Sequence, residues 1–337
     1  MDAVRQIADA VLYEGYVLWP YRRSALKNQR RWTFGGVYPE GHSSRHADDP
    51  HVMRTQCLLE GGDDTRLDVR VRFLHVVARQ VVRVAGRRRE DVAELTVAGE
   101  RHLSWDEAVE REIVAGDLVA GALAGGHRQA IGIAAATQRE ELHDDDGRLA
   151  GEIARTWEPL EGAVDIGAER LAPGLVRLTV TVTNTTPWAG DDREGALRRT
   201  FCSTHTVLHA EGGAFVSLTD PPEALRDVAE ACRRATAGTW PVLVGDPGER
   251  HTMLSSPIIL EDHPRIAPES PGDLFDGGEI DQMLTLNILS LTDEEKAEMR
   301  DSDPKTRAIL ERTEALGEEE LMRLNGAIRD IGMVRER

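Results

Sequence analysis

Cysteine, aromatic residues and long apolar runs are all scarce in this sequence of 337 residues. The cysteines are Cys57, Cys202 and Cys232, an odd number at wide spacings, which excludes a disulfide framework. The longest nearly apolar stretch, Leu118–Gly126, is far shorter than the roughly 20 residues that span a bilayer. The residues Met1–Arg5 do not begin a basic and then apolar leader, so no secretory signal is predicted. These absences predict a soluble, cytoplasmic protein.

Basic residues are outnumbered, with 41 Lys and Arg against 59 Asp and Glu and a formal net charge of −18. This acidic balance argues against a general duplex-DNA binder, because such proteins neutralise phosphates with an excess of basic side chains. The sequence also has no phosphate loop, dinucleotide fingerprint, nucleophile elbow or zinc-protease motif. With 40% hydrophobic and 30% charged residues, the composition is that of a globular protein with one large domain or two ordinary ones.

The middle of the chain, residues 51–260, is dominated by period-two patterns that predict β-strands. Apolar residues alternate with polar ones from Leu67 to Phe73, and again from Val176 to Thr183. A hairpin is predicted around Asp146 and Gly147, with a turn of two or more residues. A second strand pair is predicted on either side of Gly212 and Gly213, from Phe201–Ala210 and Ala214–Leu218.

Helices are predicted between these strands. Ser104–Glu107 resembles a capping signal before a helix over Ala108–Ile113. A second helix is predicted from Pro221 through Cys232, with an apolar stripe of Ala224, Leu225, Val228 and Ala231. The predicted fold class is therefore α+β: a largely antiparallel β-sandwich or open-barrel core with interspersed helices and a helical C-terminal region.

Three regions of different composition are predicted. Residues 1–50 form an aromatic and basic N-terminal segment, which ends in a polar stretch from Pro39 to Pro50 that interrupts any regular element. Residues 51–260 form the β-rich core domain. Residues 261–337 begin with an acidic loop rich in Pro and Gly and continue as helices, the first of which starts at the capping box Thr292–Glu295.

Cys202, His205 and His209 are the candidate metal ligands. The two histidines share a face of either a strand or a helix, because a spacing of four residues suits both periods. Converging imidazoles hold divalent transition metals such as nickel or zinc, and His251 is a candidate further ligand. On a strand, however, Cys202 points the opposite way, and no second ligand pair follows. The alternative is that these are ordinary sheet residues.

The acidic loop is a second candidate site. Its titratable groups suit a hard cation, acid–base chemistry, docking on a basic partner, or simply turns and solvation. Its spacing does not match an EF-hand. The titratable residues are Asp262, His263, Glu269, Asp273, Asp276, Glu279 and Asp281, and Phe275 is a further candidate for docking on a partner.

The N-terminal segment offers a third candidate site, in which aromatic and basic side chains alternate. Tyr, Trp and Arg are enriched at protein interfaces, and the same residues also stack on bases and bind phosphates. The remaining interpretation is that the segment packs on the β-rich core domain and that its arginines form ion pairs with the excess of acidic side chains. The candidate partner-binding residues are Tyr16, Trp19, Tyr21, Arg22, Arg23 and Lys27.

Several long segments of the sequence resemble an uncharacterised bacterial family encoded beside actinobacterial-type, high-affinity nickel–iron hydrogenases. These segments are Leu12–Gln29, Gly213–Pro222, Thr239–Gly245, Leu254–Pro264, Ala267–Asp276, Glu279–Asp281 and Leu291–Lys296. Together they extend over most of the chain. They are specific to the family, but they do not indicate a particular chemical activity. Members of the family continue past the position matching Arg337, so the resemblance predicts that this chain is either a natural short form or a trimmed one.

The resemblance implies a role in assembling, maturing or scaffolding a hydrogenase, with hydrogenase subunits or maturation factors as partners. The leading hypothesis is therefore a non-enzymatic accessory protein that acts through protein–protein docking, with neither a membrane nor nucleic acid as partner. The alternative is a metal-binding protein or metal-dependent enzyme using Cys202, His205 and His209, with nickel tested first. A weaker third hypothesis is single-stranded nucleic-acid binding through the N-terminal segment.

Overall fold

The computed structural model describes Phe34–Arg265 together with parts of both terminal regions, namely residues 5, 7–9, 11, 12, 292–300, 307, 310, 311, 314 and 315. The described residues up to Pro264 belong to one compact unit. Arg265 and the described residues of the C-terminal region belong to a second unit. Within the described residues, no helix has the length and apolar character needed to cross a bilayer.

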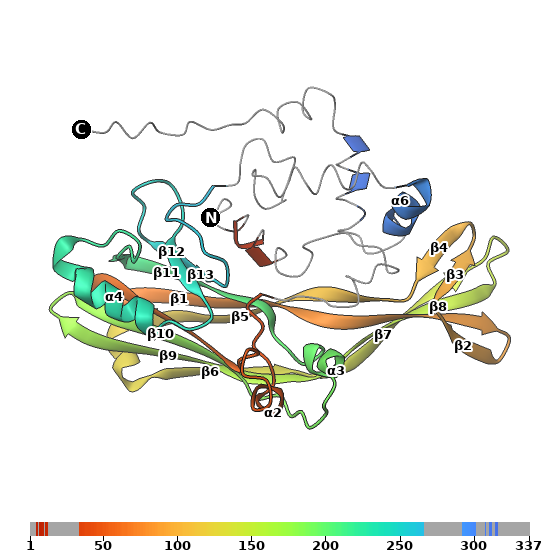
Figure 1. Ribbon diagram of the computed structural model, residues 1–337, viewed down its shortest axis with the longest axis horizontal. Coiled ribbons are helices and arrows are strands. Elements are labelled where there is room, and N and C mark those ends of the chain that lie inside the picture. The colour runs from red at the N-terminus through yellow and green to blue at the C-terminus, as the bar shows by residue number, and fades with distance from the viewer. Residues whose placement is uncertain are drawn as a thin grey trace. The chain divides into compact units, whose positions relative to one another are not determined.

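The first unit is built on a large antiparallel sheet, so the β-rich part of the predicted fold class is confirmed. Its strands run in the order β12-β13-β11-β1-β10-β9-β6, with β2, β5, β7 and β8 joined to it, and β3 and β4 form a sheet of their own (Figure 1). The strands are β1 (Val52–Ala85), β2 (Arg88–Val92), β3 (Glu94–Val97), β4 (Glu100–Leu103), β5 (Trp105–Val119), β6 (His127–Ile133), β7 (Ala136–His143), β8 (Leu149–Trp157), β9 (Leu160–Ala172), β10 (Leu175–Asn184), β11 (Cys202–Phe215), β12 (Trp240–Leu243) and β13 (Thr252–Ser256).

Strand β1 organises this unit, because it pairs with five other strands along its 34 residues. Its first part, Val52–Glu60, pairs with β10, whereas Arg66–Arg79 pairs with β5. Strand β11 accompanies both parts, with a shift of register between Gly61 and Arg66. The two parts of β1 therefore belong to two halves of one sheet.

Both halves of the sheet contribute to a single apolar core. The alternation predicted for Leu67–Phe73 is confirmed, because its apolar residues are at most 2% exposed. The alternation predicted within β10 is also confirmed, and Val180 lies in the same core as Phe73. The rings of Phe73 and Phe201 stack there with their centroids 4.7 Å apart.

The far end of β1 continues beyond this core. Ala78–Arg83 pairs with β8, which also pairs with β7, and the end of β1 forms a hairpin with β2. Figure 1 shows β2, β3, β4, β7 and β8 at the opposite end of the unit from β12 and α4 (Arg226–Ala235). The hairpin predicted around Asp146 and Gly147 is confirmed as β7 and β8, with a turn from Asp144 to Arg148.

The helix predicted over Ala108–Ile113 is wrong, because these residues lie within β5. Pairing with β1 over more than ten residues outweighs the short capping signal. The hydroxyl of Ser104 accepts a hydrogen bond from the Val81 amide at 2.8 Å and donates to the Val92 carbonyl at 2.7 Å. Ser104 thus joins strands instead of capping a helix.

The hairpin predicted around Gly212 and Gly213 is also wrong. Strand β11 runs through both glycines without reversing, and its partner along this whole length is β1. Gly212 has a φ of +78°, a conformation that glycine adopts without steric cost. It lies where the register between β11 and β1 shifts, so the glycines bend the strand instead of ending it.

Helices are short in the described residues. The helix predicted after Pro221 is confirmed as η3 (Glu223–Leu225) followed by α4, although Ala224 and Ala231 are exposed and the buried side chains are Ala229 and Cys232. The helix predicted at Thr292 is confirmed as α6 (Asp293–Arg300). Further short helices include α2 (Glu40–Ser43), which lies inside the predicted polar stretch, η2 (Ala120–Gly125) and α3 (Arg193–Leu197).

Candidate functional site

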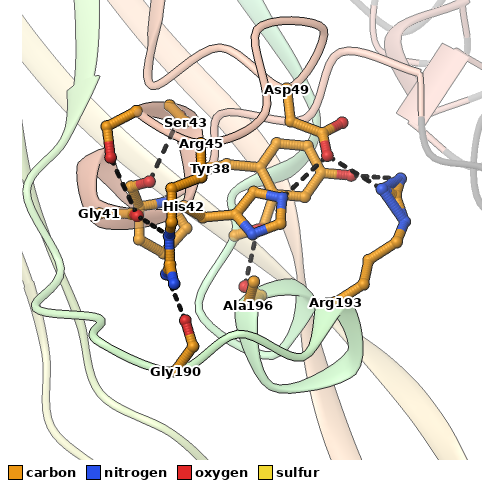
Figure 2. Close-up of polar contacts among 12 residues, drawn as sticks. Tyr38, Gly41, His42, Ser43, Arg45, Asp49, Gly190, Arg193 and Ala196 are labelled. Carbon is orange, nitrogen blue, oxygen red and sulfur yellow. Dashed lines mark hydrogen bonds and ion pairs between the residues drawn. The ribbon is translucent and has the colours of Figure 1, made fainter.

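Four polar side chains from two distant parts of the chain meet beside α2 and α3. Tyr38 and Asp49 flank α2, which carries His42, and α3 begins at Arg193. Pro39 precedes α2, and its carbonyl accepts a hydrogen bond from the His42 amide at 2.9 Å. We call Tyr38, His42, Asp49 and Arg193 the His42 network (Figure 2).

Asp49 is the centre of the His42 network. Its Oδ2 atom lies 2.9 Å from His42 Nε2 and 2.9 Å from Arg193 Nη1. Arg193 Nη2 in turn donates a hydrogen bond to the Tyr38 hydroxyl at 2.9 Å, and its guanidinium carbon lies 5.6 Å from the centroid of the Tyr38 ring. One carboxylate thus joins an imidazole to a guanidinium, as Figure 2 shows. Such charge-assisted contacts are stronger than neutral hydrogen bonds.

The His42 ring is enclosed by other rings. It stacks on Tyr38 with centroids 5.1 Å apart and on His46 with centroids 4.3 Å apart. Tyr38 and His42 are only 2% and 1% exposed, whereas His46 is exposed. A histidine oriented by a carboxylate is the arrangement used for proton transfer. Here the imidazole is out of reach of a substrate, so the geometry supports a structural function.

Backbone contacts attach the same segment to the sheet. Val37 forms a bridge with Phe201, and the Tyr38 amide donates to the Pro50 carbonyl at 2.8 Å. The buried Asn184 amide donates to the carbonyls of Val37 and Arg199, both at 2.8 Å. The His42 network therefore closes a loop whose two ends are both held by the sheet.

No known protein family, curated protein or solved structure matches this chain.

The candidate metal ligands are not brought together. Cys202 and His205 are fully buried, whereas His209 is exposed and its Nδ1 atom lies 3.0 Å from Thr252 Oγ1. His251 is also exposed, with Nδ1 3.0 Å from the Gly213 carbonyl. Within the part of the chain that the structure describes, no group of three or more His, Cys, Asp or Glu side chains is placed to hold a metal.

His205 is buried by the N-terminal region of the same unit. The hydroxyl of Ser203 donates to the Val11 carbonyl at 3.3 Å, and Arg72, paired with His205 in the sheet register, forms an ion pair with Asp9. Burial, and then the positive charge of Arg72, lowers the pKa of His205 from 6.5 to about 4. His205 is therefore neutral at physiological pH.

Two candidate residues of the acidic loop are described, and both have structural contacts. The Asp262 carboxylate accepts hydrogen bonds from the Leu243 amide at 2.8 Å and from the Ser217 hydroxyl. The His263 amide donates to the Leu243 carbonyl at 2.7 Å. These residues attach the start of the loop to β12.

The other predicted partner-binding residues lie outside the described residues. They are Tyr16, Trp19, Tyr21, Arg22, Arg23, Lys27, Glu269, Asp273, Phe275, Asp276, Glu279 and Asp281.

The His42 network is not predicted by any motif in the sequence. One signal was present, because His42 and His46 are four residues apart after a proline, a spacing that places two side chains on one face of a helix. The contribution of Arg193 had no local signal, since it lies 144 residues from Asp49. The polar composition of Pro39–Pro50 therefore predicts only an interruption of regular structure.

Substituting Asp49 with alanine is expected to lower the free energy of unfolding by about 2 kcal/mol, because it removes two charge-assisted hydrogen bonds. Urea unfolding followed by circular dichroism measures this change. The matched control is Asp48→Ala, which removes an exposed carboxylate next to it and is expected to change the free energy by less than about 0.5 kcal/mol. Equal stabilities of the two variants would contradict the importance of the network.

Proposed function

We propose that this protein is a cytoplasmic, non-enzymatic accessory protein that acts with a nickel–iron hydrogenase in assembly, maturation or scaffolding, through protein–protein docking. The proposal includes an open-barrel arrangement of the β-rich core, supported by the single core that both halves of the sheet share. The resemblance to a family encoded beside such hydrogenases supplies the identity of the partner. The observation that carries the docking function is the exposure of β7.

Strand β7 presents an open edge. Seven of its eight residues are exposed, and among the described residues it pairs only with β8. An exposed strand edge offers unpaired backbone N–H and C=O groups, to which a strand of another protein can add. The charged side chains Arg139, Glu140 and Glu141 limit non-specific pairing and give the edge a pattern that a partner can recognise.

The His42 network, most of which lies N-terminal to the sheet in the sequence, also supports this proposal. It fixes the chain from Val37 onward, shortly after the predicted partner-binding residues Tyr16–Lys27. A fixed attachment point restricts where those residues can reach, and restricting a binding segment lowers the entropic cost of docking. Nothing in the described residues favours the metal-dependent alternative.

The proposal predicts specific co-purification. The tagged protein is isolated gently from its host under hydrogenase-expressing conditions, and the bound proteins are identified by mass spectrometry. Hydrogenase subunits or maturation factors are expected in near-stoichiometric amounts. Glu140→Lys combined with Glu141→Lys reverses the charge of β7 and is expected to reduce this recovery about tenfold, the effect of losing roughly 1.4 kcal/mol of binding energy.

The matched control combines Glu211→Lys with Glu223→Lys, which changes the net charge equally at exposed positions away from β7. This control is expected to retain the partner. A further variant, Trp19→Ala with Arg23→Ala, tests the N-terminal candidates in the same assay. Repeated recovery of the protein alone would refute the accessory function, and equal recovery by the β7 variant would exclude β7 as the docking edge.

A further inference from the structure

An open hollow lies on the outer face of β10, β9 and β6, which are neighbours in the large sheet (Figure 1). The opposite face of these strands supplies core residues such as Ile166 and Val180. The volume of the hollow is about 400 Å³, within the range of small-molecule sites. We call it the β9 hollow, and the residues that line it include Gly126, Arg128, Asp165, Gly167, Thr179 and Thr181.

The register of the three strands creates the β9 hollow. Thr181, Asp165 and Arg128 form one row across β10, β9 and β6. The next row has only Thr179 and Gly167, because the pairing of β6 with β9 does not extend that far. A Cβ atom added at Gly167 would meet no atom within 4 Å. The space therefore results from a glycine that faces the end of a neighbouring strand.

The charges on either side of the Gly167 row are paired. In the first row, Arg128 Nη1 lies 3.2 Å from Asp165 Oδ1. In the row beyond Gly167, Arg177 Nη1 lies 3.0 Å from Glu169 Oε2. Two positive and two negative side chains thus balance each other around the hollow. This balance favours a ligand without net charge, because an ion would be attracted by one member of each pair and repelled by the other.

The polar atoms of the hollow include both donors and acceptors of hydrogen bonds. The Gln56 side-chain amide donates to Thr179 Oγ1 at 3.0 Å, which leaves the hydroxyl proton of Thr179 for another acceptor. Arg128 and Asp165 are 65% and 42% exposed, so a ligand can reach further N–H groups of one and the carboxylate of the other. Hydroxyl groups suit this mixture, because each one donates and accepts.

We infer that the β9 hollow binds a neutral saccharide ring. Asp165 accepts hydrogen bonds from the ring hydroxyls, while Arg128 and Thr179 donate to them. Hydroxyls on neighbouring ring carbons suit the paired oxygens of a carboxylate and the fork of a guanidinium. The missing side chain of Gly167 lets the ring approach the backbone of the sheet. This small-molecule site goes beyond the proposed docking function and does not depend on it.

Saturation-transfer difference NMR with D-glucose, D-galactose and D-mannose tests the inference. At least one hexose is expected to bind with a Kd of about 1 mM, because an open hollow contacts only one side of the ring. Gly167→Val is expected to weaken this binding at least about tenfold, because its side chain fills the hollow. The variant is expected to fold, because Gly167 has no positive φ and valine suits a strand.

The matched control is Gly132→Val on β6. Gly132 does not line the β9 hollow, and a Cβ atom added there also meets no atom within 4 Å. This control is expected to bind the hexose as the wild type does. Circular dichroism and thermal unfolding check the fold of each variant.

Asp165→Asn gives a second readout, which depends on charge. It is expected to weaken binding of the neutral hexose about tenfold, because a charge-assisted hydrogen bond becomes a neutral one. The affinity for D-glucuronate is expected to rise in the same variant, because the positive charge of Arg128 is no longer balanced by Asp165. A residue that only supported the fold would not change the two affinities in opposite directions.

Several results would overturn the inference: no saturation transfer to any of the three hexoses, equal binding by Gly167→Val and the wild type, or unchanged affinities in Asp165→Asn. Saturation of L-serine without saturation of any hexose would also overturn it, since it would indicate a site for a zwitterion. The titrations contain no hydrogenase protein. A failure to bind hexoses therefore leaves the docking function standing, and a failure to recover a partner leaves the saccharide site standing.

Discussion

Substituting Phe73 with alanine is expected to lower the free energy of unfolding by about 4 kcal/mol, the usual cost of removing a buried phenyl ring. The ring is fully buried and stacks on Phe201 where the two halves of the sheet share their core. The surrounding strands are held by their register, so they cannot collapse into the space that the ring leaves. Urea unfolding measures the change.

Phe34→Ala provides the matched control, because it removes the same side chain at a position that is 48% exposed. Its effect is expected to be within about 0.5 kcal/mol. If both variants lost the same stability, the core described for the sheet would be wrong.

Acidification is expected to destabilise the protein through His205. Its pKa in the folded state is about 4, compared with 6.5 for an exposed histidine. The unfolded chain therefore takes up a proton as the pH falls below 6.5, whereas the folded protein does so only near pH 4. Stability is complete above pH 6.5 and is lost as the pH falls toward 4, by about 2–3 kcal/mol between pH 7 and 4.5.

Other groups also titrate in this range, so the measurement compares the wild type with His205→Gln. Urea unfolding of both proteins at pH 7 and pH 4.5 gives two losses of stability, and the loss in the variant is expected to be about 2 kcal/mol smaller. The readout is this difference in pH dependence, which is separate from any constant effect of the substitution at pH 7. Identical losses would show that His205 is not held neutral in the folded protein.

Strand periodicity was the strongest part of the sequence signal. Alternation in Leu67–Phe73 and in β10 predicted strands and core residues because each of these strands has one face in the core. The signal failed for β5, where Ala108–Ile113 carries no strict alternation. That strand is specified by its long pairing with β1, a contact between distant residues that local patterns do not contain.

Glycine pairs were ambiguous for a related reason. Gly212 and Gly213 suit a hairpin turn, yet they also suit a bend in a continuous strand. The choice depends on Gly61 of β1, which lies opposite Gly213. Because Gly61 belongs to another strand, the sequence of β11 alone does not show whether the two glycines form a turn or a bend.

The candidate sites could not be predicted for the same reason, because they depend on contacts between residues that are far apart in the sequence. Cys202, His205 and His209 have a spacing compatible with metal binding, but the N-terminal region buries one end of the strand and leaves the other exposed. The His42 network depends on which side chains meet after folding. The pairing of Arg193 with Asp49 has no local sequence pattern.

The central position of β1 has a consequence for the synthesis of the protein on the ribosome. β1 ends at Ala85, but its partner β11 ends only at Phe215. At 5–20 residues per second, the roughly 130 intervening residues take about 7 to 26 seconds to translate. During this interval, the apolar residues of β1 have left the ribosome without all of their partners. The nascent chain is therefore expected to need a holding chaperone, and translation slowed over residues 86–215 is expected to increase its aggregation.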